Sequence, residues 1–244
     1  MFIIIKSPPY REGWEGLNYF MKKLIIYTLL ALTNTAAFAQ KDAQAKIILD
    51  QVSRKYRSFN VIKSDFTFTL DNPQQGIKQS RNGTLLSQSK TNKFKVTLYN
   101  AEGTKPEVEQ EIINDGKSQW TYNKKDKEVE LSNAGHSSGE FNPAQLFTMY
   151  EHGYKYLYTG MQKINGKVYQ VIDLSPEDDK KEYYKIRLLI DKLKKQIYSA
   201  LIFDNNDNKY NYTLRNFITN TPIMDNIFTF DAKEHPGVEV VDLR

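Results

Sequence analysis

The feature that most constrains the fold of this chain is an alternation of apolar and polar residues with a period of two. In the stretch SDFTFTLD, Phe66, Phe68 and Leu70 alternate with an aspartate and two threonines, and the stretch KFKVTLYN at 93–100 repeats the pattern. Successive side chains of a β-strand point to opposite faces, so each stretch predicts a strand with one buried face and one exposed face. Such half-buried strands are typical of antiparallel sheets.

The same pattern predicts a long antiparallel meander of about eleven strands. The 16 tyrosines and 13 phenylalanines favour β structure. Short polar turns, such as NDGK at 114–117 and DNNDN at 204–208, separate the segments. The further predicted strands are EQEIIND, QWTYNK, KEVELSN, VYQVIDLSP, YKIRLLID, QIYSALIFD, KYNYTLRNF, IFTFD and VEVVDL.

Two segments have a helical pattern instead. Within residues 42–59, apolar residues such as Leu49 and Val52 recur at three- and four-residue spacing, which predicts an amphipathic helix. The segment 132–158 combines an Asn-Pro pair at 142–143 with a short apolar run, which predicts a second, shorter helix. We therefore expect a mainly β fold, an open antiparallel half-barrel covered by an N-terminal helix and a short mid-chain helical lid.

The N-terminal region has the order of a secretion signal. Two lysines follow Met21 and precede an apolar run that ends in the small residues Ala-Phe-Ala. This run is shorter than the roughly 20 residues that cross a bilayer as a helix. We expect residues 1–39 to be an upstream extension and signal peptide, with translation starting at Met21 and cleavage before Gln40. Residues 40–244 are then expected to form a single domain.

Composition excludes several classes of function. The chain has no cysteine, which excludes disulfides, thiol nucleophiles and the lipid-modified cysteine that tethers a bacterial lipoprotein. The net charge is +5, and lysines alternate with acidic residues without forming a basic block, so we expect no nucleic-acid partner. We expect an untethered monomer in the periplasm of a Gram-negative bacterium.

No motif for catalysis or metal binding stands out. His136, His152 and His235 occur singly, without the spacing of a zinc site. The serines of GHSSGE lack the strand and helix context of a hydrolase nucleophile. DNNDNK resembles the start of a calcium loop, but Lys209 replaces the required glycine, so a hairpin turn explains it better. We therefore expect no enzyme activity, no metal and no cofactor.

Several segments occur in the order and spacing of a known family. They are AKIILDQVSRKYRSFNVIKSDFTFTL, NGTLLSQSKTNKFKVTLYN, EIINDGKSQWTYNKKDKEVEL, NPAQLF, VIDLSPEDDKKEYYKIRLLIDKLKKQIYSALIFDNNDNKYNYTLRNF and the ending IFTFDAKEHPGVEVVDLR. In these segments the chain resembles the periplasmic outer-membrane lipoprotein carrier family of the LolA type. The resemblance implies an unclosed barrel with a helical lid, whose apolar interior takes the acyl chains of lipoproteins. An inner-membrane ATP-driven release complex would supply this cargo, and an outer-membrane acceptor would receive it.

The resemblance and the alternation together indicate candidate cargo contacts. The positions that match cavity strands of the family are Phe94, Ile112, Trp120 and Tyr122. The alternation adds Phe66, Phe68, Val96 and Leu98. The helical lid is expected to contribute Leu49, Val52, Leu146, Phe147 and Met149.

One departure from the family concerns the lid. The family pattern has an Arg-Pro pair just before the strand that carries Phe94, and its arginine is thought to latch the lid. Here Lys90 and Thr91 occupy those places. A lysine offers one point charge where an arginine offers a planar fork of donors, so Lys90 is a possible latch with fewer bonds to give.

Two other functions stay open at this stage. One is an envelope protein that binds or senses lipids on the same fold, because a fold does not determine a function. The other is a secreted hydrolase, which ranks lower because the chain shows no nucleophile and base.

Overall fold

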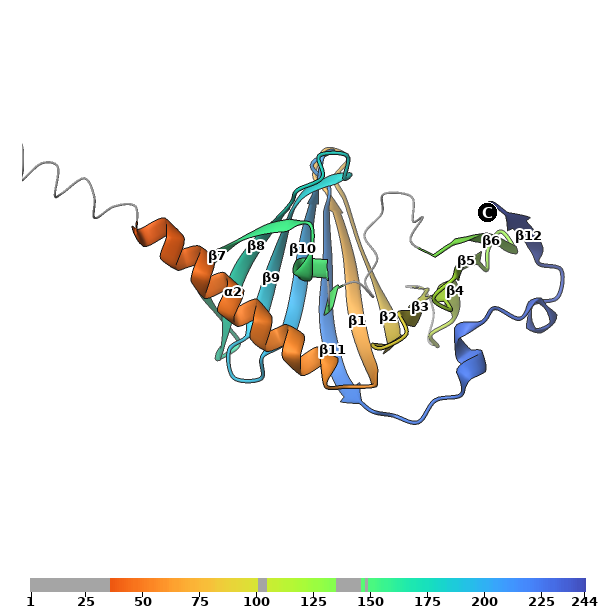
Figure 1. Cartoon of the computed structure of the whole chain (residues 1–244). Helices are drawn as coiled ribbons and strands as arrows, with labels where there is room; N and C mark the ends of the chain where they lie inside the picture. Colours follow the sequence, from red (N-terminus) through yellow and green to blue (C-terminus); the bar gives the residue numbers. More distant parts are fainter. Residues whose placement is uncertain (1–35, 101–104, 135–145, 148) are drawn as a thin grey trace, which may run out of the picture. The chain divides into compact units, whose positions relative to one another are not determined.

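The computed structural model describes residues 36–100, 105–134, 146–147 and 149–244 (Figure 1). The chain divides into two compact units, Met1–Ala43 and Gln44–Arg244, and the described strands all belong to the second unit. The expected secretion signal up to residue 35 and the expected helix start at 142–143 lie outside the described residues.

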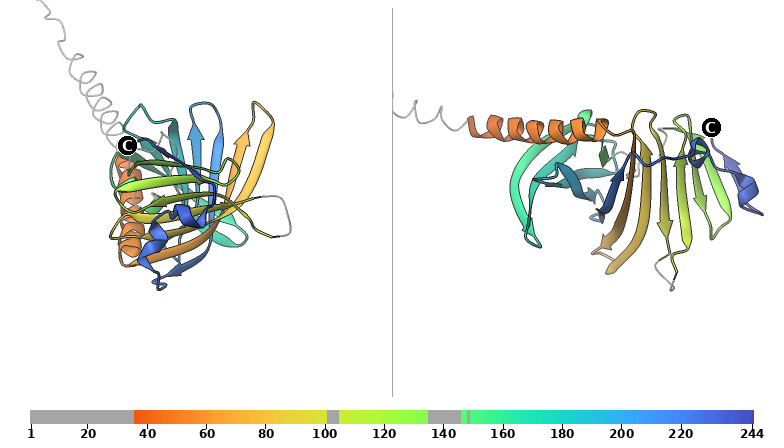
Figure 2. Two further views of the ribbon diagram at one scale, coloured as in Figure 1. Left: turned by 90° about the vertical axis from the view of Figure 1, so that its right-hand side faces the viewer. Right: turned by 90° about the horizontal axis from the view of Figure 1, so that it is seen from below.

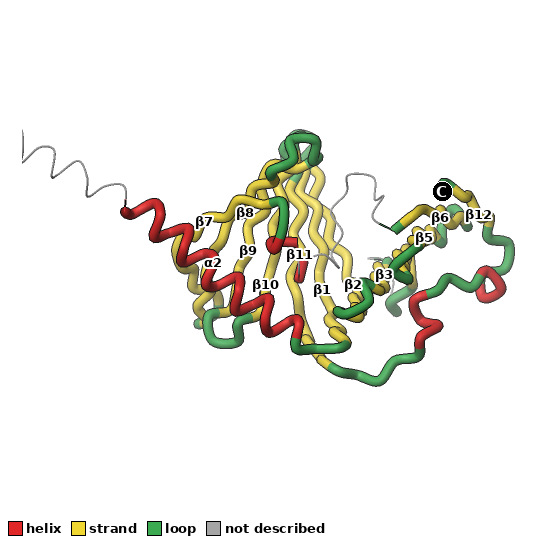
Figure 3. Tube along the Cα trace, viewed as in Figure 1, coloured by secondary structure: helices red, strands yellow, loops and turns green. Residues whose placement is uncertain are grey.

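Strands dominate the described chain (Figure 3). They are β1 (Val61–Asn72), β2 (Ile77–Gln88), β3 (Lys93–Tyr99), β4 (Val108–Asn114), β5 (Ser118–Asn123), β6 (Glu128–Asn133), β7 (Tyr154–Ile164), β8 (Lys167–Pro176), β9 (Tyr183–Asp191), β10 (Gln196–Asp204), β11 (Lys209–Thr219) and β12 (Glu239–Asp242). Within the described residues these form one twelve-stranded sheet in the order β12-β6-β5-β4-β3-β2-β1-β11-β10-β9-β8-β7. Neighbours are antiparallel except β12, which runs parallel to β6. The end strands β7 and β12 do not pair with each other, so the sheet stays open and the predicted half-barrel is confirmed.

The predicted N-terminal helix is confirmed as α2, which spans Ala36–Arg57. Its part from Gln44 onward lies across one face of the sheet (Figure 2). Two contacts fasten its end: Lys55 Nζ donates to the carbonyl oxygen of Lys194 at 2.6 Å, and the backbone N–H of Ile197 donates to the Tyr56 hydroxyl at 3.1 Å. The remaining described helices are short 3-10 turns, η2 (Met149–Glu151), η3 (Asp225–Phe228) and η4 (Ala232–Glu234).

The register assigns each side chain to one of two faces of the sheet. Leu85 pairs with Val96, Val96 with Ile112, and Ile112 with Thr121. Directly opposed residues share a face, so these four mark one side, which we call the inner face. Helix α2 and η2 pack on the inner face, because their buried side chains belong to the same cluster as Leu85 and Val96.

The opposite, outer face carries a second group of buried side chains. Ile113 and Tyr122 lie on this face and are buried. Chain after β11 covers them: η3 contacts β3, and the ring centroids of Tyr122 and Phe230 lie 5.4 Å apart. His235 also packs on Tyr122, with ring centroids 4.5 Å apart. The C-terminal segment therefore supplies the outer face with an apolar cover of its own.

The alternation missed two strands and misassigned one segment. Strand β2 was missed because most of its side chains are polar and at least partly exposed. Strand β7 was assigned to the helical insert, although its tyrosines alternate with other residues. The segment IFTFD at 227–231 was predicted to be a strand, but η3 ends within it at Phe228. Phe228 is fully buried and Phe230 packs on Tyr122 of the outer face, so the spacing of these apolar residues does not reflect a strand.

Gly83 lies at a position inside the sheet where space requires a glycine. Gly83 of β2 lies opposite Phe66 of β1. A Cβ atom at Gly83 would meet Phe66 Cζ at 2.4 Å and the carbonyl oxygen of Thr97 at 2.7 Å. Because both distances are far below van der Waals contact, the missing side chain is what allows the Phe66 ring to lie directly over β2.

The calcium-like stretch is a hairpin turn, as expected. It joins β10 to β11, and the Asp204 carboxylate accepts hydrogen bonds from the backbone N–H groups of Asn206 and Asn208 at 2.9 and 2.7 Å. Among the described residues, no group of three or more His, Asp or Glu side chains is arranged to hold a metal ion.

Candidate functional site

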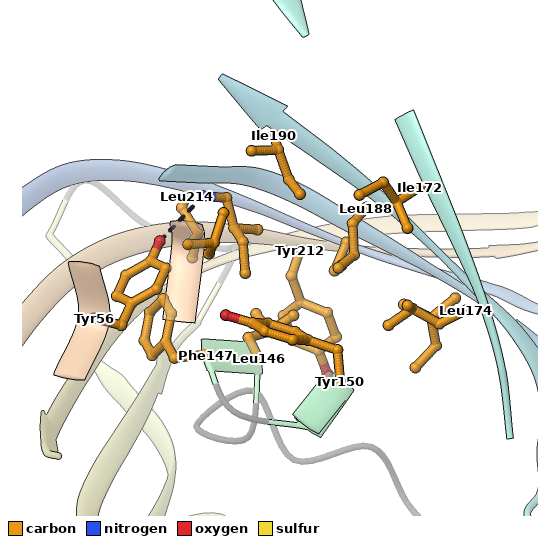
Figure 4. Packing of buried hydrophobic residues seen from close by; sticks show 14 of the residues in the cluster. Tyr56, Leu146, Phe147, Tyr150, Ile172, Leu174, Leu188, Ile190, Tyr212 and Leu214 are labelled. Carbon is orange, nitrogen blue, oxygen red and sulfur yellow. Dashed lines mark hydrogen bonds between the residues drawn. The ribbon is translucent and has the colours of Figure 1, made fainter. Parts of the chain in front are cut away.

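The buried core of the described residues is an apolar interior between the inner face of the sheet and the elements that cover it (Figure 4). Strands β8 and β9 contribute aliphatic side chains such as Leu174 and Leu188, both fully buried. Strand β11 adds Tyr212 and Leu214. From the other side, the covering elements contribute Ala45, Ile48, Leu49, Val52, Tyr56, Leu146, Phe147 and Tyr150.

Aromatic contacts join the helix to the lid segment, which we define as the described residues Leu146, Phe147 and Met149–Glu151. The rings of Tyr56 and Phe147 have centroids 4.3 Å apart. Phe217 of β11 packs edge-on against both of them, at 5.6 and 6.2 Å. The lid segment is therefore held by rings from α2 and from the sheet together.

A charged contact fastens the lid segment to α2. Arg57 donates to Glu151 through two nitrogens, with Nε 3.0 Å from Oε1, and its second guanidinium nitrogen bonds Oε2. The Ser53 hydroxyl donates to the same carboxylate. Burial raises the pKa of Glu151, but the hydrogen bonds from Arg57 and Ser53 outweigh it and leave the pKa below its ordinary value of 4.5. A fork of donors around a carboxylate is a strong and directional contact.

The sequence-based reasoning proposed Lys90 as a latch and did not single out Arg57. Lys90 is exposed in the turn between β2 and β3, and within the described residues the polar contacts of the lid segment come from Ser53 and Arg57. The signal for Arg57 was present, since it is a basic residue in the last turn of the predicted helix. Its partner is 94 residues away in sequence, which local patterns do not reveal.

Six of the eight candidate cargo residues lie on the inner face. Phe66, Phe94 and Val96 are buried in the interior cluster. Phe68, Leu98 and Ile112 are partly buried and pack against it.

The other two candidates, Trp120 and Tyr122, lie on the outer face. Trp120 pairs with Ile113, and Tyr122 pairs with Glu111, so both point away from Ile112. The inner face of β5 carries Gln119, Thr121 and Asn123 instead. The expectation that all eight residues share one wall is therefore corrected: the apolar inner surface extends as far as Ile112 and ends at β4.

The expected lid residues come together where they can be described. Leu49 and Val52 of α2 and Leu146 and Phe147 of the lid segment are buried in one cluster. Met149 begins η2, and its side chain lies outside the described residues. Tyr56 and Tyr150 complete the same surface, and neither was among the candidate cargo residues.

No described helix is both long enough and apolar enough to pass through a membrane. The described residues thus form an open sheet whose apolar inner face is covered by one helix and a short lid.

The class of protein comes from a comparison with known families, and the fold of the matching family is that of a binding or carrier protein. The family model described as outer membrane lipoprotein carrier protein LolA matches residues 57–231. The chain belongs to the LolA family. No curated protein sequence matches the chain.

A solved structure shares the fold at low sequence identity. An uncharacterized conserved protein from Thermus thermophilus is 11% identical with a TM-score of 0.54, over 82% of this chain and 99% of that one. Two further matches have lower TM-scores. A LolA superfamily protein from Nitrosomonas europaea is 13% identical with a TM-score of 0.44, over 76% and 97% of the two chains. The lipoprotein LppX from Mycobacterium tuberculosis is 14% identical with a TM-score of 0.45, over 75% and 98%.

Proposed function

We propose that this protein is a periplasmic carrier that shelters the acyl chains of lipoproteins and takes them from the inner to the outer membrane. The observation that carries the proposal is the continuous apolar interior beneath α2 and the lid segment, in a chain of the LolA family. Its proposed partners are acylated lipoproteins, an inner-membrane ATP-driven release complex and an outer-membrane acceptor. The working unit is residues 40–244 after removal of the signal segment, acting as a monomer.

Energetics favour a sheltered route for such cargo. Exposing one methylene to water costs about 0.8 kcal/mol, so a chain of about 16 carbons costs on the order of 12 kcal/mol. The inner face from β7 to β4 offers aliphatic and aromatic side chains that can replace water around the chain. An acyl chain that enters between the lid segment and the sheet would separate Phe147 from its present contacts with Tyr56 and Phe217.

The second candidate function is an envelope protein that binds or senses a free lipid. The observation that favours it is the tyrosine content of the interior, where Tyr56, Tyr150 and Tyr212 are all buried. Native mass spectrometry of the purified full chain separates the two. A co-purifying acylated peptide supports the carrier, and a free lipid supports the second function.

Depletion tests the carrier role in cells. Loss of the protein should leave outer-membrane lipoproteins in the inner-membrane fraction after membrane separation. Normal delivery in its absence would contradict the proposal.

A pair of variants tests the assigned wall. Ile112→Arg places a charge at the edge of the apolar inner surface, where the side chain is only partly buried. It should abolish cargo binding and leave the fold intact. Ile218→Arg is the matched control, because Ile218 of β11 pairs with Lys63 on the outer face and is 51% exposed. Equal cargo binding by the two variants would show that the cargo does not bind to the inner face at Ile112.

A further inference from the structure

Two buried phenol groups stand out within the apolar interior. Tyr150 is 4% exposed and Tyr56 is 1% exposed. Figure 4 shows the Tyr150 ring lying across the interior, with its hydroxyl directed toward Tyr56 and Phe147. The two tyrosines come from the two elements that close the interior, η2 and α2.

The Tyr150 hydroxyl has no hydrogen-bond partner among the described residues. The Tyr56 oxygen accepts from the backbone N–H of Ile197, which leaves the Tyr56 proton itself without an acceptor among those residues. A buried polar group without a partner is unfavourable compared with an apolar group of the same shape. Phenylalanine would fill the place of Tyr150 without this cost, so the hydroxyl does not serve the packing of the empty protein.

The surroundings determine what kind of group could satisfy these hydroxyls. Burial raises the pKa of Tyr150, and the nearby Tyr56 adds to the rise, so the phenol stays protonated and acts as a donor. Arg57 of α2, whose charge acts on Tyr150, is already paired with Glu151. An anionic group would be poorly solvated there, whereas a neutral carbonyl oxygen needs only a donor.

We propose that the Tyr150 hydroxyl, with Tyr56 beside it, donates a hydrogen bond to the carbonyl oxygen of an acyl ester or amide in the bound lipid. This inference rests on the proposed function and goes further, because it makes the interior selective for acyl chains over alkyl chains. Since Tyr150 belongs to the lid segment, the bond also joins the ligand to the lid.

A matched pair of lipids provides the test. Monopalmitoyl glycerol and hexadecyl glyceryl ether have the same head group and nearly the same chain, but only the ester has a carbonyl. Their affinities for the full chain are measured by displacement of an environment-sensitive fluorophore. The wild-type protein should bind the ester about 5- to 10-fold more tightly than the ether, the effect of one neutral hydrogen bond.

Tyr150→Phe should remove this preference by weakening ester binding about 5- to 10-fold while ether binding stays unchanged. The same variant should unfold at a higher temperature than the wild type in the absence of lipid, because it loses an unpaired buried hydroxyl. Tyr184→Phe is the control, since Tyr184 is 50% exposed, and it should change neither quantity.

The outcomes separate the two proposals. If both lipids bind equally well, or if Tyr150→Phe keeps the ester preference, the hydrogen bond is refuted while acyl-chain sheltering stands. If neither lipid binds, both proposals are refuted.

Discussion

The contact between Arg57 and Glu151 should control how often the lid segment separates from α2. Glu151→Gln keeps the shape of the side chain and the hydrogen bond from Ser53, but it removes the charge that Arg57 binds. The Glu151 side chain is 16% exposed and that of Arg57 is 65% exposed, so solvent screens the pair. An exposed pair contributes about 0.2 to 1 kcal/mol, and the forked geometry places this one near the upper end.

A loss of about 1 kcal/mol corresponds to a roughly fivefold higher ratio of open to closed lid. Hydrogen exchange of the η2 amides, followed by mass spectrometry, measures this ratio. Asp50→Asn is the matched control, because it removes the same charge from α2 and breaks only the exposed Lys46–Asp50 pair. It should leave η2 exchange unchanged.

The pH dependence of hydrogen exchange in η2 provides a second test of the same contact. The pKa of Glu151 is lowered in the folded protein. The ionised carboxylate therefore stabilises the closed lid segment at any pH above 4.5, the ordinary pKa of a glutamate, and this stabilisation is lost as the pH falls through the lowered pKa. Protection of η2 in the wild type should therefore fall in acid below pH 4.5, and the Glu151→Gln variant should lack this step. Equal exchange in the wild type and Glu151→Gln near neutral pH would refute the latch.

Three further changes probe the framework of the sheet. Gly83→Ala should lower the free energy of unfolding by about 2 to 4 kcal/mol, because the added Cβ overlaps Phe66 and a backbone oxygen; an unchanged urea midpoint would contradict this. Tyr122→Ala should lower the free energy of unfolding in urea by about 2 to 4 kcal/mol, because the packing on the outer face is lost. It should leave lipid binding intact, and a folded variant that has lost lipid binding would show that Tyr122 belongs to the site. Lys95→Met should lower the free energy of unfolding by about 1 to 3 kcal/mol, because it leaves the buried Glu111 carboxylate without the ammonium group 2.8 Å away. An unchanged melting temperature would show that the ion pair does not stabilise the fold.

The alternation of apolar and polar residues predicted strands correctly where one face of the strand is apolar and the other is polar. Strands β1 and β3 follow the rule, and both were predicted with the correct side inward. Strand β2 has few apolar side chains, so its pattern has little contrast. Strand β7 places tyrosines inward, and a tyrosine is compatible with either face of a sheet because it has an apolar ring and a polar tip.

The candidate site was predicted in part for the same reason. Phe94 and Val96 could be assigned to one face together, since they belong to one strand. Trp120 and Tyr122 belong to another strand, and only the pairing between strands decides which of its faces matches that of Ile112. A shift of one residue in register exchanges the two faces of a strand. Even a correct strand prediction therefore does not say which of its side chains face the apolar interior.

The sequence by itself determined most of the strands, the N-terminal helix and the lack of cysteine chemistry, because these depend on local period and on residue type. The order of its segments also carried the resemblance to the family. Tertiary structure alone decided that Arg57 meets Glu151, that the C-terminal segment covers the outer face, and that Tyr56 and Tyr150 share one apolar interior. Each of these contacts joins residues separated by many positions in the chain. The packing of the folded sheet brings such residues together, and no local pattern encodes which distant partner each of them will have.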